Sequence, residues 1–243
     1  MREQLFTVKQ VTAVAANTYE ILLAGDTDGL DVPGRFVNIR LDGFYLRRPL
    51  SICDCSNGLL TLIFKAVGAG TKKLAMLPSG TQLNLLTGLG NGYDLSRAGE
   101  HPLLIGGGAG VPPMFLACKK LTDMGNKPIV ILGFNSADEV FYVDRFRNLG
   151  VEVLITTADG SMGIRGFVTD ALPGLDYTYY YTCGPEPMLK TVYQSAQGNG
   201  EFSFEERMGC GFGACVGCTC KTKYGNKRIC RDGPVLIKEE IVW

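Results

Sequence analysis

The sequence predicts a multidomain protein of the β plus α/β class, with an antiparallel β-barrel, a parallel α/β domain and a small cysteine-rich domain. Three observations carry this prediction. Short apolar runs with many β-branched residues fill about the first 95 residues, strands alternate with helical segments over about the next hundred, and five cysteines follow Met208. We place the domains at residues 1–98, 99–200 and 201–243.

The barrel is predicted from segments such as RFVNIRL and LLTLIFKAV, which glycine, proline, aspartate and asparagine separate. Within this region, LRRPLSICD places an R-P-x-S element at the start of a strand, formed by Arg48, Pro49, Leu50 and Ser51. A guanidinium can bind a pyrophosphate, and a serine with the strand backbone can hydrogen-bond the edge of a flavin ring. A buried arginine in a salt bridge is the alternative for this element taken alone.

A second element of this kind follows in IFKAVGAGTKKL, where a strand ends before Gly68, Gly70 and Thr71 and a short helix begins. Backbone amides at the start of a helix favour phosphate groups. An ordinary β-turn is the alternative for this segment by itself. Its position after the R-P-x-S element favours the phosphate interpretation.

The α/β domain is predicted from strand-like PLLIGGG, PIVILGF, VEVLITT and YTYYYTCG, which alternate with helical MFLACKKLTDMG and EPMLKTVYQSA. Such alternation implies a Rossmann-like parallel sheet with crossover connections. The glycines of IGGGAGVPP lie between a strand and a helix, where a dinucleotide-binding sheet receives its ligand. The full G-x-G-x-x-G is absent because Pro113 stands in place of its last glycine, so a plain strand-to-helix turn stays open.

Two further features of this domain concern the nucleotide. The segment TCGPEPML forms a second strand-to-helix junction and contains Cys183. After the second strand, Asp138 and Glu139 are available, and no arginine follows before Arg145. An acidic residue in this region suits the free ribose hydroxyl of NAD, so the segment favours NAD over NADP.

The cysteine-rich segment carries the most specific signal. Cys210, Cys215 and Cys218 are spaced C-x4-C-x2-C and Cys230 follows, which is the plant-type [2Fe-2S] ligand spacing. The glycines between them suit a loop that wraps closely around a cluster. A four-cysteine zinc site is the alternative, although zinc sites usually contain two C-x2-C pairs and only one is present here. Cys220 is a surplus thiol, either a packed neighbour or a ligand in place of Cys218.

Composition excludes several functions. The 24 lysines and arginines balance the 24 aspartates and glutamates, so we expect no nucleic-acid partner. Glycines and prolines interrupt the long apolar stretch 102–118, so we expect no membrane span, and the N-terminus lacks a secretory pattern. We therefore expect a cytoplasmic location, and in that reducing compartment the nine cysteines are expected to be thiols, metal ligands or core residues instead of disulfides. With His101 as the single histidine, we predict no catalytic acid–base residue.

The order of R-P-x-S, G-x-G-T, GGGAGVPP and CGPxPML resembles the ferredoxin-NADP reductase superfamily. With EERMGCGFGAC and ICRDGPV at the end, the whole chain is similar to the electron-transfer subunits of NAD-dependent (class 1B) dihydroorotate dehydrogenases. This resemblance implies a FAD-binding barrel, an NAD-binding α/β domain and a [2Fe-2S] domain. It also implies an FMN-containing catalytic partner subunit, in a heterotetramer with two copies of each chain.

The resemblance also assigns residues. It implies cluster ligation by Cys210, Cys215, Cys218 and Cys230, and it matches Gly90–Gly92 to the family's LGNG segment. Gly108, Gly110 and Cys183 would face NAD, which is a substrate. The implied FAD contacts are Arg48, Pro49, Leu50, Ser51, Ile63, Phe64, Lys65, Gly70 and Thr71.

Nicotinamide exchanges electrons in pairs and an iron–sulfur cluster passes them singly, so a flavin must stand between them. Together with this requirement, the resemblance implies an oxidoreductase subunit of pyrimidine biosynthesis that carries electrons from the partner's FMN through [2Fe-2S] and FAD to NAD+. One alternative is a FAD/[2Fe-2S] NAD(P)H reductase subunit of another electron-transfer complex. Another is a zinc-bearing interaction subunit without catalysis.

Overall fold

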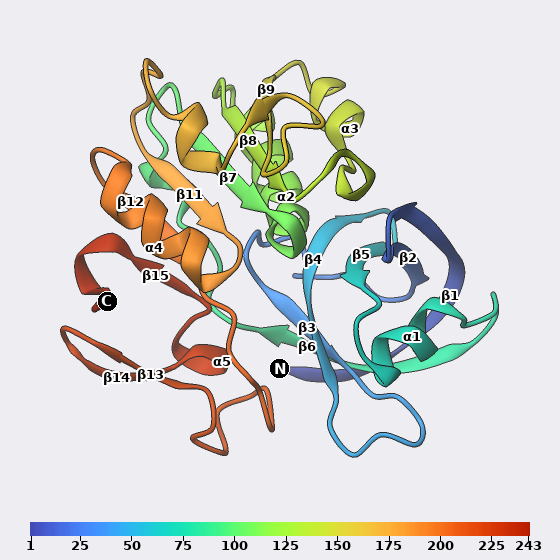
Figure 1. The fold of residues 1–243 in the computed structure, drawn as a ribbon. Coiled ribbons are helices and arrows are strands. Elements are labelled where there is room, and N and C mark those ends of the chain that lie inside the picture. The colour runs from blue at the N-terminus through green and yellow to red at the C-terminus, as the bar shows by residue number, and fades with distance from the viewer.

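The computed structural model describes every residue from Met1 to Trp243. Its N-terminal half is a closed antiparallel barrel with the strand order β1-β2-β5-β4-β3-β6 (Figure 1). Alternate side chains of these strands point inward and form one apolar core. The barrel elements are β1 (Arg2–Ala15), β2 (Thr18–Ala24), β3 (Phe36–Ile39), β4 (Arg48–Ser56), β5 (Leu59–Lys65), α1 (Ala69–Ala75) and β6 (Gln82–Leu89).

A seven-stranded sheet follows, with the order β10-β9-β8-β7-β11-β12-β15. All its neighbouring strands are parallel except β12 and β15, which are antiparallel. Its strands are β7 (Leu103–Gly107), β8 (Ile129–Phe134), β9 (Glu152–Thr157), β10 (Ile164–Arg165), β11 (Tyr180–Cys183), β12 (Gly200–Ser203) and β15 (Val235–Ile237). Its helices are α2 (Val111–Asp123), α3 (Val143–Arg147) and α4 (Glu186–Ser195).

Short elements complete the chain. The hairpin of β13 (Thr219–Thr222) and β14 (Gly225–Arg228) leads into α5 (Ile229–Asp232). The 3-10 turns are η1 (Leu95–Arg97), η2 (Gly108–Gly110), η3 (Ala137–Glu139), η4 (Val168–Ala171) and η5 (Lys238–Glu240). The predicted fold class is confirmed: a six-stranded antiparallel barrel precedes a largely parallel sheet with helices. None of the helices is long and apolar enough to cross a lipid bilayer.

The domain boundaries stay a prediction. Hydrogen bonding in the seven-stranded sheet crosses the predicted boundary between residues 200 and 201. Strand β12 spans it, and β15 returns from the cysteine-rich region to pair with β12, with Phe202 opposite Leu236. This pairing satisfies backbone groups that would otherwise be left at the sheet edge. The cysteine-rich segment is therefore held at both ends by the seven-stranded sheet.

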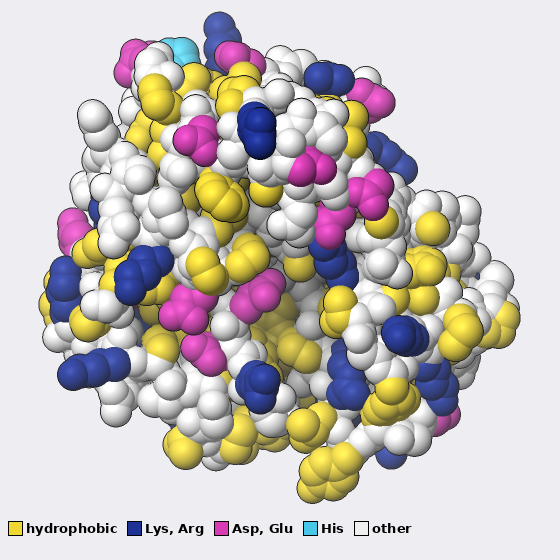
Figure 2. Space-filling model, in the orientation of Figure 1, with side chains coloured by type: hydrophobic (Ala, Val, Ile, Leu, Met, Phe, Trp, Pro, Cys, Tyr) yellow, Lys and Arg dark blue, Asp and Glu magenta, His cyan; other side chains and the backbone are white.

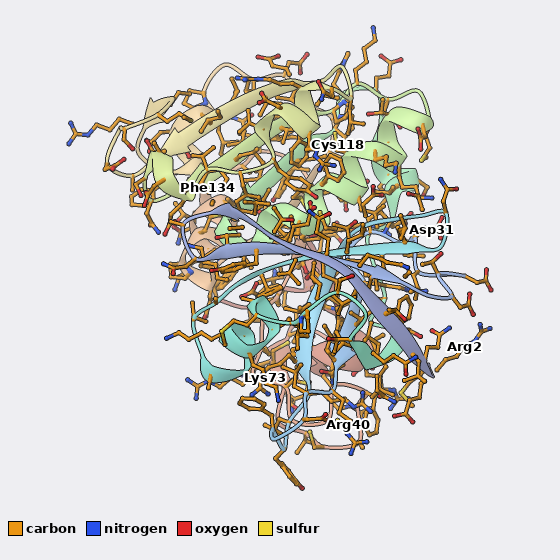
Figure 3. All side chains as sticks on the ribbon, turned by 90° about the vertical axis from the view of Figure 1, so that its right-hand side faces the viewer. Arg2, Asp31, Arg40, Lys73, Cys118 and Phe134 are labelled. Atoms are coloured by element: carbon orange, nitrogen blue, oxygen red, sulfur yellow. The ribbon has the colours of Figure 1, made fainter.

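The barrel and the sheet are joined by buried and half-buried polar contacts. The Tyr93 hydroxyl donates to the Thr182 carbonyl at 2.9 Å, and Lys119 pairs with Asp54 at 2.9 Å. Figure 3 shows the α/β layer resting on the barrel, with Cys118 inside that layer. The cysteine-rich segment lies beside the barrel, below the sheet (Figure 1).

Candidate functional site

The four predicted ligand thiols form two close pairs. The Sγ atoms of Cys210 and Cys215 lie 3.4 Å apart, and those of Cys218 and Cys230 lie 3.3 Å apart. Three of these residues precede β13, whereas Cys230 lies in α5, which the β13–β14 hairpin returns to Cys218. Two thiolates on one tetrahedral ion with 2.3 Å bonds would lie about 3.8 Å apart. Each pair therefore has nearly the spacing that one metal ion needs.

The pairs do not converge on a single ion. No group of three cysteine, histidine or acidic side chains in the chain surrounds one metal position. A four-cysteine zinc site needs all four thiols around one atom, whereas a [2Fe-2S] cluster needs two thiolates at each of two irons. The donor set and its division into pairs therefore fit the two-iron cluster better than zinc.

Backbone amides surround the outer pair, Cys210 and Cys215. The N–H groups of Phe212 and Cys215 donate to the Cys210 sulfur at 3.5 and 3.4 Å. Burial opposes ionisation of Cys210, but these amides and the Cys215 thiol outweigh it and lower the pKa of Cys210 to about 6. The loop is thus arranged to hold a thiolate.

Two glycines let this loop approach the rest of the protein. Gly211 and Gly213 both have positive φ angles, 79° and 90°. A Cβ atom on Gly211 would lie 2.2 Å from Nδ2 of Asn38, and one on Gly213 would lie 2.8 Å from Cδ of Arg231. A side chain at either position would strain the backbone and displace the side chain that faces it.

Cys220 belongs to neither of the two thiol pairs. It lies on β13 opposite Lys227 of β14 and is half-buried. Burial raises the pKa of its thiol, and the Glu206 carboxylate adds to this effect. The structure therefore places Cys220 as a neighbour of the cysteine pairs.

A cavity of about 270 Å³ lies where the barrel, the sheet and the cysteine-rich segment meet. Figure 2 shows a hollow near the middle of this face, with acidic side chains gathered on one side of it. Eight of the predicted cofactor residues line the cavity: Pro49, Leu50, Ser51, Ile63, Phe64, Lys65, Thr71 and Cys183. Its further lining includes residues that the sequence did not indicate, among them Phe36, Phe204, Glu205, Glu206 and Met208.

Two predicted flavin contacts, Arg48 and Gly70, do not line this cavity but touch each other beside it. A Cβ atom on Gly70 would lie 2.5 Å from Nε of Arg48, so the glycine makes room for the guanidinium. The same guanidinium lies 5.0 Å from the Phe44 ring centroid and donates to the Leu46 carbonyl at 2.5 Å. The R-P-x-S element and the G-x-G-T element therefore come together, as their order in the sequence favours.

A second cavity, of about 500 Å³, opens at the carboxyl ends of the parallel strands β7, β8 and β9. This is the edge at which open α/β sheets bind ligands. Gly108 lines it, whereas Gly110 is buried, with the Cys183 carbonyl oxygen 2.1 Å from where its Cβ would be. Gly110 thus lets the two strand-to-helix junctions pack closely. Cys183 lies on the wall of the first cavity, of about 270 Å³, which we call the flavin-side cavity.

The second cavity, of about 500 Å³, which we call the nucleotide-side cavity, also contains a residue that no sequence pattern indicated. Thr156, at the end of β9, is fully buried and lines the cavity. Its hydroxyl has no hydrogen-bond partner in the protein. A buried hydroxyl is normally hydrogen-bonded, so this group suits a ligand that brings the partner.

Lys65 lines both cavities and forms an ion pair with Glu139, with 3.0 Å between Nζ and Oε1. Glu139 is one of the two acidic residues from which the preference for NAD was predicted, and it lines the nucleotide-side cavity. Burial opposes its ionisation, but the Lys65 ammonium and the hydrogen bonds from Asn135 together outweigh burial and lower the pKa of Glu139. The pair forms part of the wall between the two cavities.

Size alone would have indicated another place. A cavity of about 530 Å³ lies beside η4 and the end of α4, with Asp176 as its single acidic or basic side chain. None of the predicted site residues lines it. Residue chemistry therefore favours the two smaller cavities.

Comparison with known proteins agrees with this geometry. The family model described as "Iron-sulfur cluster binding domain of dihydroorotate dehydrogenase B" matches residues 205–242, which contain all four paired cysteines. The chain is 43% identical to the "Dihydroorotate dehydrogenase B (NAD(+)), electron transfer subunit" of Fusobacterium nucleatum, over 97% of this chain and 96% of the relative. The chain belongs to this family. The corresponding protein of Bacillus mycoides is 39% identical and covers 100% of this chain and 99% of its own.

Solved structures extend the likeness to the fold. A structure reported for flavin-based electron bifurcation by the NADH-dependent reduced ferredoxin-NADP oxidoreductase has a TM-score of 0.88 and 28% identity, covering 98% of this chain and 90% of that one. An Amycolatopsis cytochrome P450 reductase has a TM-score of 0.70 and 22% identity, covering 80% and 65%. The second likeness concerns the fold alone. The resemblance to this family of electron-transfer subunits, which the sequence motifs indicated, is confirmed.

Proposed function

We propose that this chain carries electrons for an NAD-dependent dihydroorotate dehydrogenase, from an FMN-containing catalytic subunit through [2Fe-2S] and FAD to NAD+. The observation that carries the proposal is the division of the four cysteines into two pairs, 3.4 and 3.3 Å apart, inside the segment that matches the family model. Two dithiolate sites can hold a cluster that receives electrons singly. A cavity lined with the predicted FAD contacts can hold the flavin that passes them in pairs to NAD+.

We assign the cluster to Cys210, Cys215, Cys218 and Cys230. When bound, a [2Fe-2S] cluster supplies one-electron transfer. The chain's own part is to hold four thiolates, and the backbone N–H groups that point at the Cys210 sulfur stabilise the charged form of that ligand.

We assign FAD to the cavity of about 270 Å³, with Ser51 and the β4 and β5 backbones beside the flavin ring. Arg48, against Gly70, would neutralise the pyrophosphate. NAD+ would enter the cavity at the strand ends, where Gly108 permits close approach. Lys65 belongs to both sites, so we expect it to contact the two ligands where they meet.

The overall reaction balances without any further oxidant. Dihydroorotate loses two electrons and two protons to become orotate, while NAD+ gains a hydride and one proton is released. We propose no acid–base residue in this chain and assign removal of the substrate's protons to the catalytic subunit. The part of this chain is to accept the two electrons and present them to NAD+.

We propose a cytoplasmic heterotetramer with two copies of each subunit, acting in pyrimidine biosynthesis, with neither nucleic acid nor membrane as a partner. The Fusobacterium nucleatum relative is named as the electron transfer subunit of its enzyme, which supports a separate catalytic subunit. The balance of 24 basic and 24 acidic residues supports the absence of a polyanionic partner. Mass measurement of the co-expressed complex tests the stoichiometry, and any ratio other than two to two would refute it.

A second candidate function is an NAD(P)H reductase subunit of another flavin-based electron-transfer complex. The TM-score of 0.88 over 98% of the chain with the ferredoxin-NADP oxidoreductase structure favours it. The two functions share the cofactors and differ in the partner.

Co-expression with the candidate FMN-containing subunit, followed by an assay with dihydroorotate and NAD+, separates them. We expect a coloured complex with flavin and iron–sulfur absorption that forms orotate and NADH in equal amounts. A coloured complex that oxidises NADH with a dye but forms no orotate would favour the second function. A colourless protein that contains zinc would refute both.

A further inference from the structure

We infer that Asn38 is a positioning residue that fixes the cluster loop against the flavin-side strand of the barrel. The inference rests on the proposed cluster at the four cysteines. Asn38 lies on β3 and is almost completely buried, and its Nδ2 atom donates to the Cys210 carbonyl at 3.2 Å. This hydrogen bond joins residues 172 positions apart in the sequence.

Strand β3 connects the flavin-side cavity with the cluster loop. Side chains two residues apart on a strand share a face and lie about 7 Å apart. On this face, Phe36 lines the flavin-side cavity and packs in the same apolar cluster as Cys218 and Cys230, while Asn38 contacts the loop that carries Cys210. One short piece of strand therefore contacts the Cys210 loop directly and shares an apolar cluster with Cys218 and Cys230.

The backbone of Asn38 is itself held on the flavin side. It lies opposite Pro49 of the R-P-x-S element in the β3–β4 register. Its carbonyl accepts a hydrogen bond from Arg47 at 3.3 Å, and the same Arg47 nitrogen donates to Oδ1 of Asn84 at 2.7 Å. Because its backbone is fixed in this way, the Asn38 side chain can hold the loop at a defined distance from the flavin motif.

The fit between Asn38 and the loop is reciprocal. A Cβ atom on Gly211 would lie 2.2 Å from Nδ2 of Asn38, so the residue after Cys210 must be glycine for the amide to reach the carbonyl. The Oδ1 atom of Asn38 is buried and has no hydrogen-bond partner in the protein. An unused buried acceptor costs free energy, so packing alone would favour an apolar residue of similar volume here. The amide is explained by the bond that it makes to the loop.

The test compares Asn38→Leu and Asn38→Asp in the full chain, co-expressed with its catalytic partner. Both variants keep the branching at Cγ and lose the N–H donor, and aspartate also keeps the volume. We expect reduction of FAD by NADH to stay within about twofold of wild type. We expect reduction of the cluster by the flavin, followed by freeze-quench electron paramagnetic resonance, to slow at least tenfold, with a changed signal of the reduced cluster or less iron.

Asn91→Leu is the matched control. Asn91 donates to the Val235 carbonyl at 2.7 Å and so joins the end of the barrel to the C-terminal segment without touching the cysteine loop. We expect it to lower thermal stability and leave the cluster signal unchanged.

The inference is overturned if both Asn38 variants keep the wild-type iron content, signal and cluster reduction rate. It is also overturned if both unfold globally while Asn91→Leu folds, because a packing role would then suffice. A wild-type protein without any [2Fe-2S] signal would instead refute the proposed function.

Discussion

The cluster end and the nucleotide end of the molecule are built in different ways. At the cluster end, four thiols and the amides that face them come from one segment between Cys210 and Cys230. At the nucleotide end, the cavity lining comes from the ends of several strands and the start of α4. A site whose ligands are concentrated in one segment should fail when one ligand is lost. A dispersed site should lose only the contribution of each contact.

The largest expected effect is loss of a cysteine ligand. Cys215→Ala should abolish iron–sulfur absorption and slow electron exchange with the partner at least a hundredfold, while NADH still reduces FAD. Cys218→Ala should do the same and also lower the free energy of unfolding by roughly 1–3 kcal/mol, because Cys218 is buried in the core and Cys215 is not. Iron analysis, visible spectra and denaturant unfolding measure these differences. Full iron content in either variant would contradict the ligand assignment.

Cys220→Ser is the matched control for the cysteine variants. Because Cys220 lies on β13 outside both thiol pairs, the variant should keep its iron and its spectrum. Loss of iron in Cys220→Ser, together with retention in Cys218→Ser, would show that the two residues exchange roles.

A smaller effect is expected at the nucleotide end from Thr156→Val, which removes the hydroxyl without changing the shape. If that hydroxyl binds the nucleotide, KM for NADH should rise about fivefold and kcat should stay unchanged, as expected for loss of about 1 kcal/mol of binding. Steady-state kinetics with a dye acceptor measures this. Thr157→Val is the control: its hydroxyl donates to the Met162 carbonyl at 2.8 Å, so it should lose stability and keep KM. An unchanged KM in Thr156→Val would remove Thr156 from the site.

The smallest effect is expected from Glu139→Gln, in the wall between the cavities. Burial opposes ionisation, but Lys65 and Asn135 together outweigh it and lower the pKa of Glu139 below its usual 4.5, so the charged carboxylate stabilises the fold at neutral pH. This contribution is present above pH 4.5 and is lost as the pH falls through the lowered pKa. The variant should be less stable by about 0.5–1 kcal/mol at pH 7 and equal to wild type in acid. Urea unfolding at several pH values tests this, and a difference that persists in acid would assign the effect to packing.

The same contrast explains what the sequence could predict. The cysteine spacing indicated the cluster segment, and the order of the R-P-x-S and G-x-G-T elements indicated the flavin side, because each signal is local in the chain. The pairing of Cys218 with Cys230 was not predictable from spacing, since it requires the β13–β14 hairpin to return α5 to the loop. Local patterns thus predict donors, and tertiary contacts determine which donors meet.

The dispersed residues were missed for a related reason. Phe204 and Met208 line the flavin-side cavity, but Phe204 lies in an irregular segment, and the EERMGCGFGAC motif that contains Met208 indicated only the cluster. Thr156 is the penultimate residue of an ordinary strand, and only the structure identifies its hydroxyl as unpartnered. Asn38 is one polar residue in an otherwise apolar strand, and its contact with Cys210 joins distant parts of the chain. Such roles depend on which surfaces pack together.

The most direct test of the account is reduction of FAD from each end of the assembled complex. In wild type, dihydroorotate and NADH should each reduce FAD under anaerobic conditions. In the complex that carries Cys215→Ala, NADH should still reduce FAD at the wild-type rate and dihydroorotate should not, because electrons from the partner must pass the cysteine site. Reduction of FAD by dihydroorotate at the wild-type rate in that variant would contradict the account.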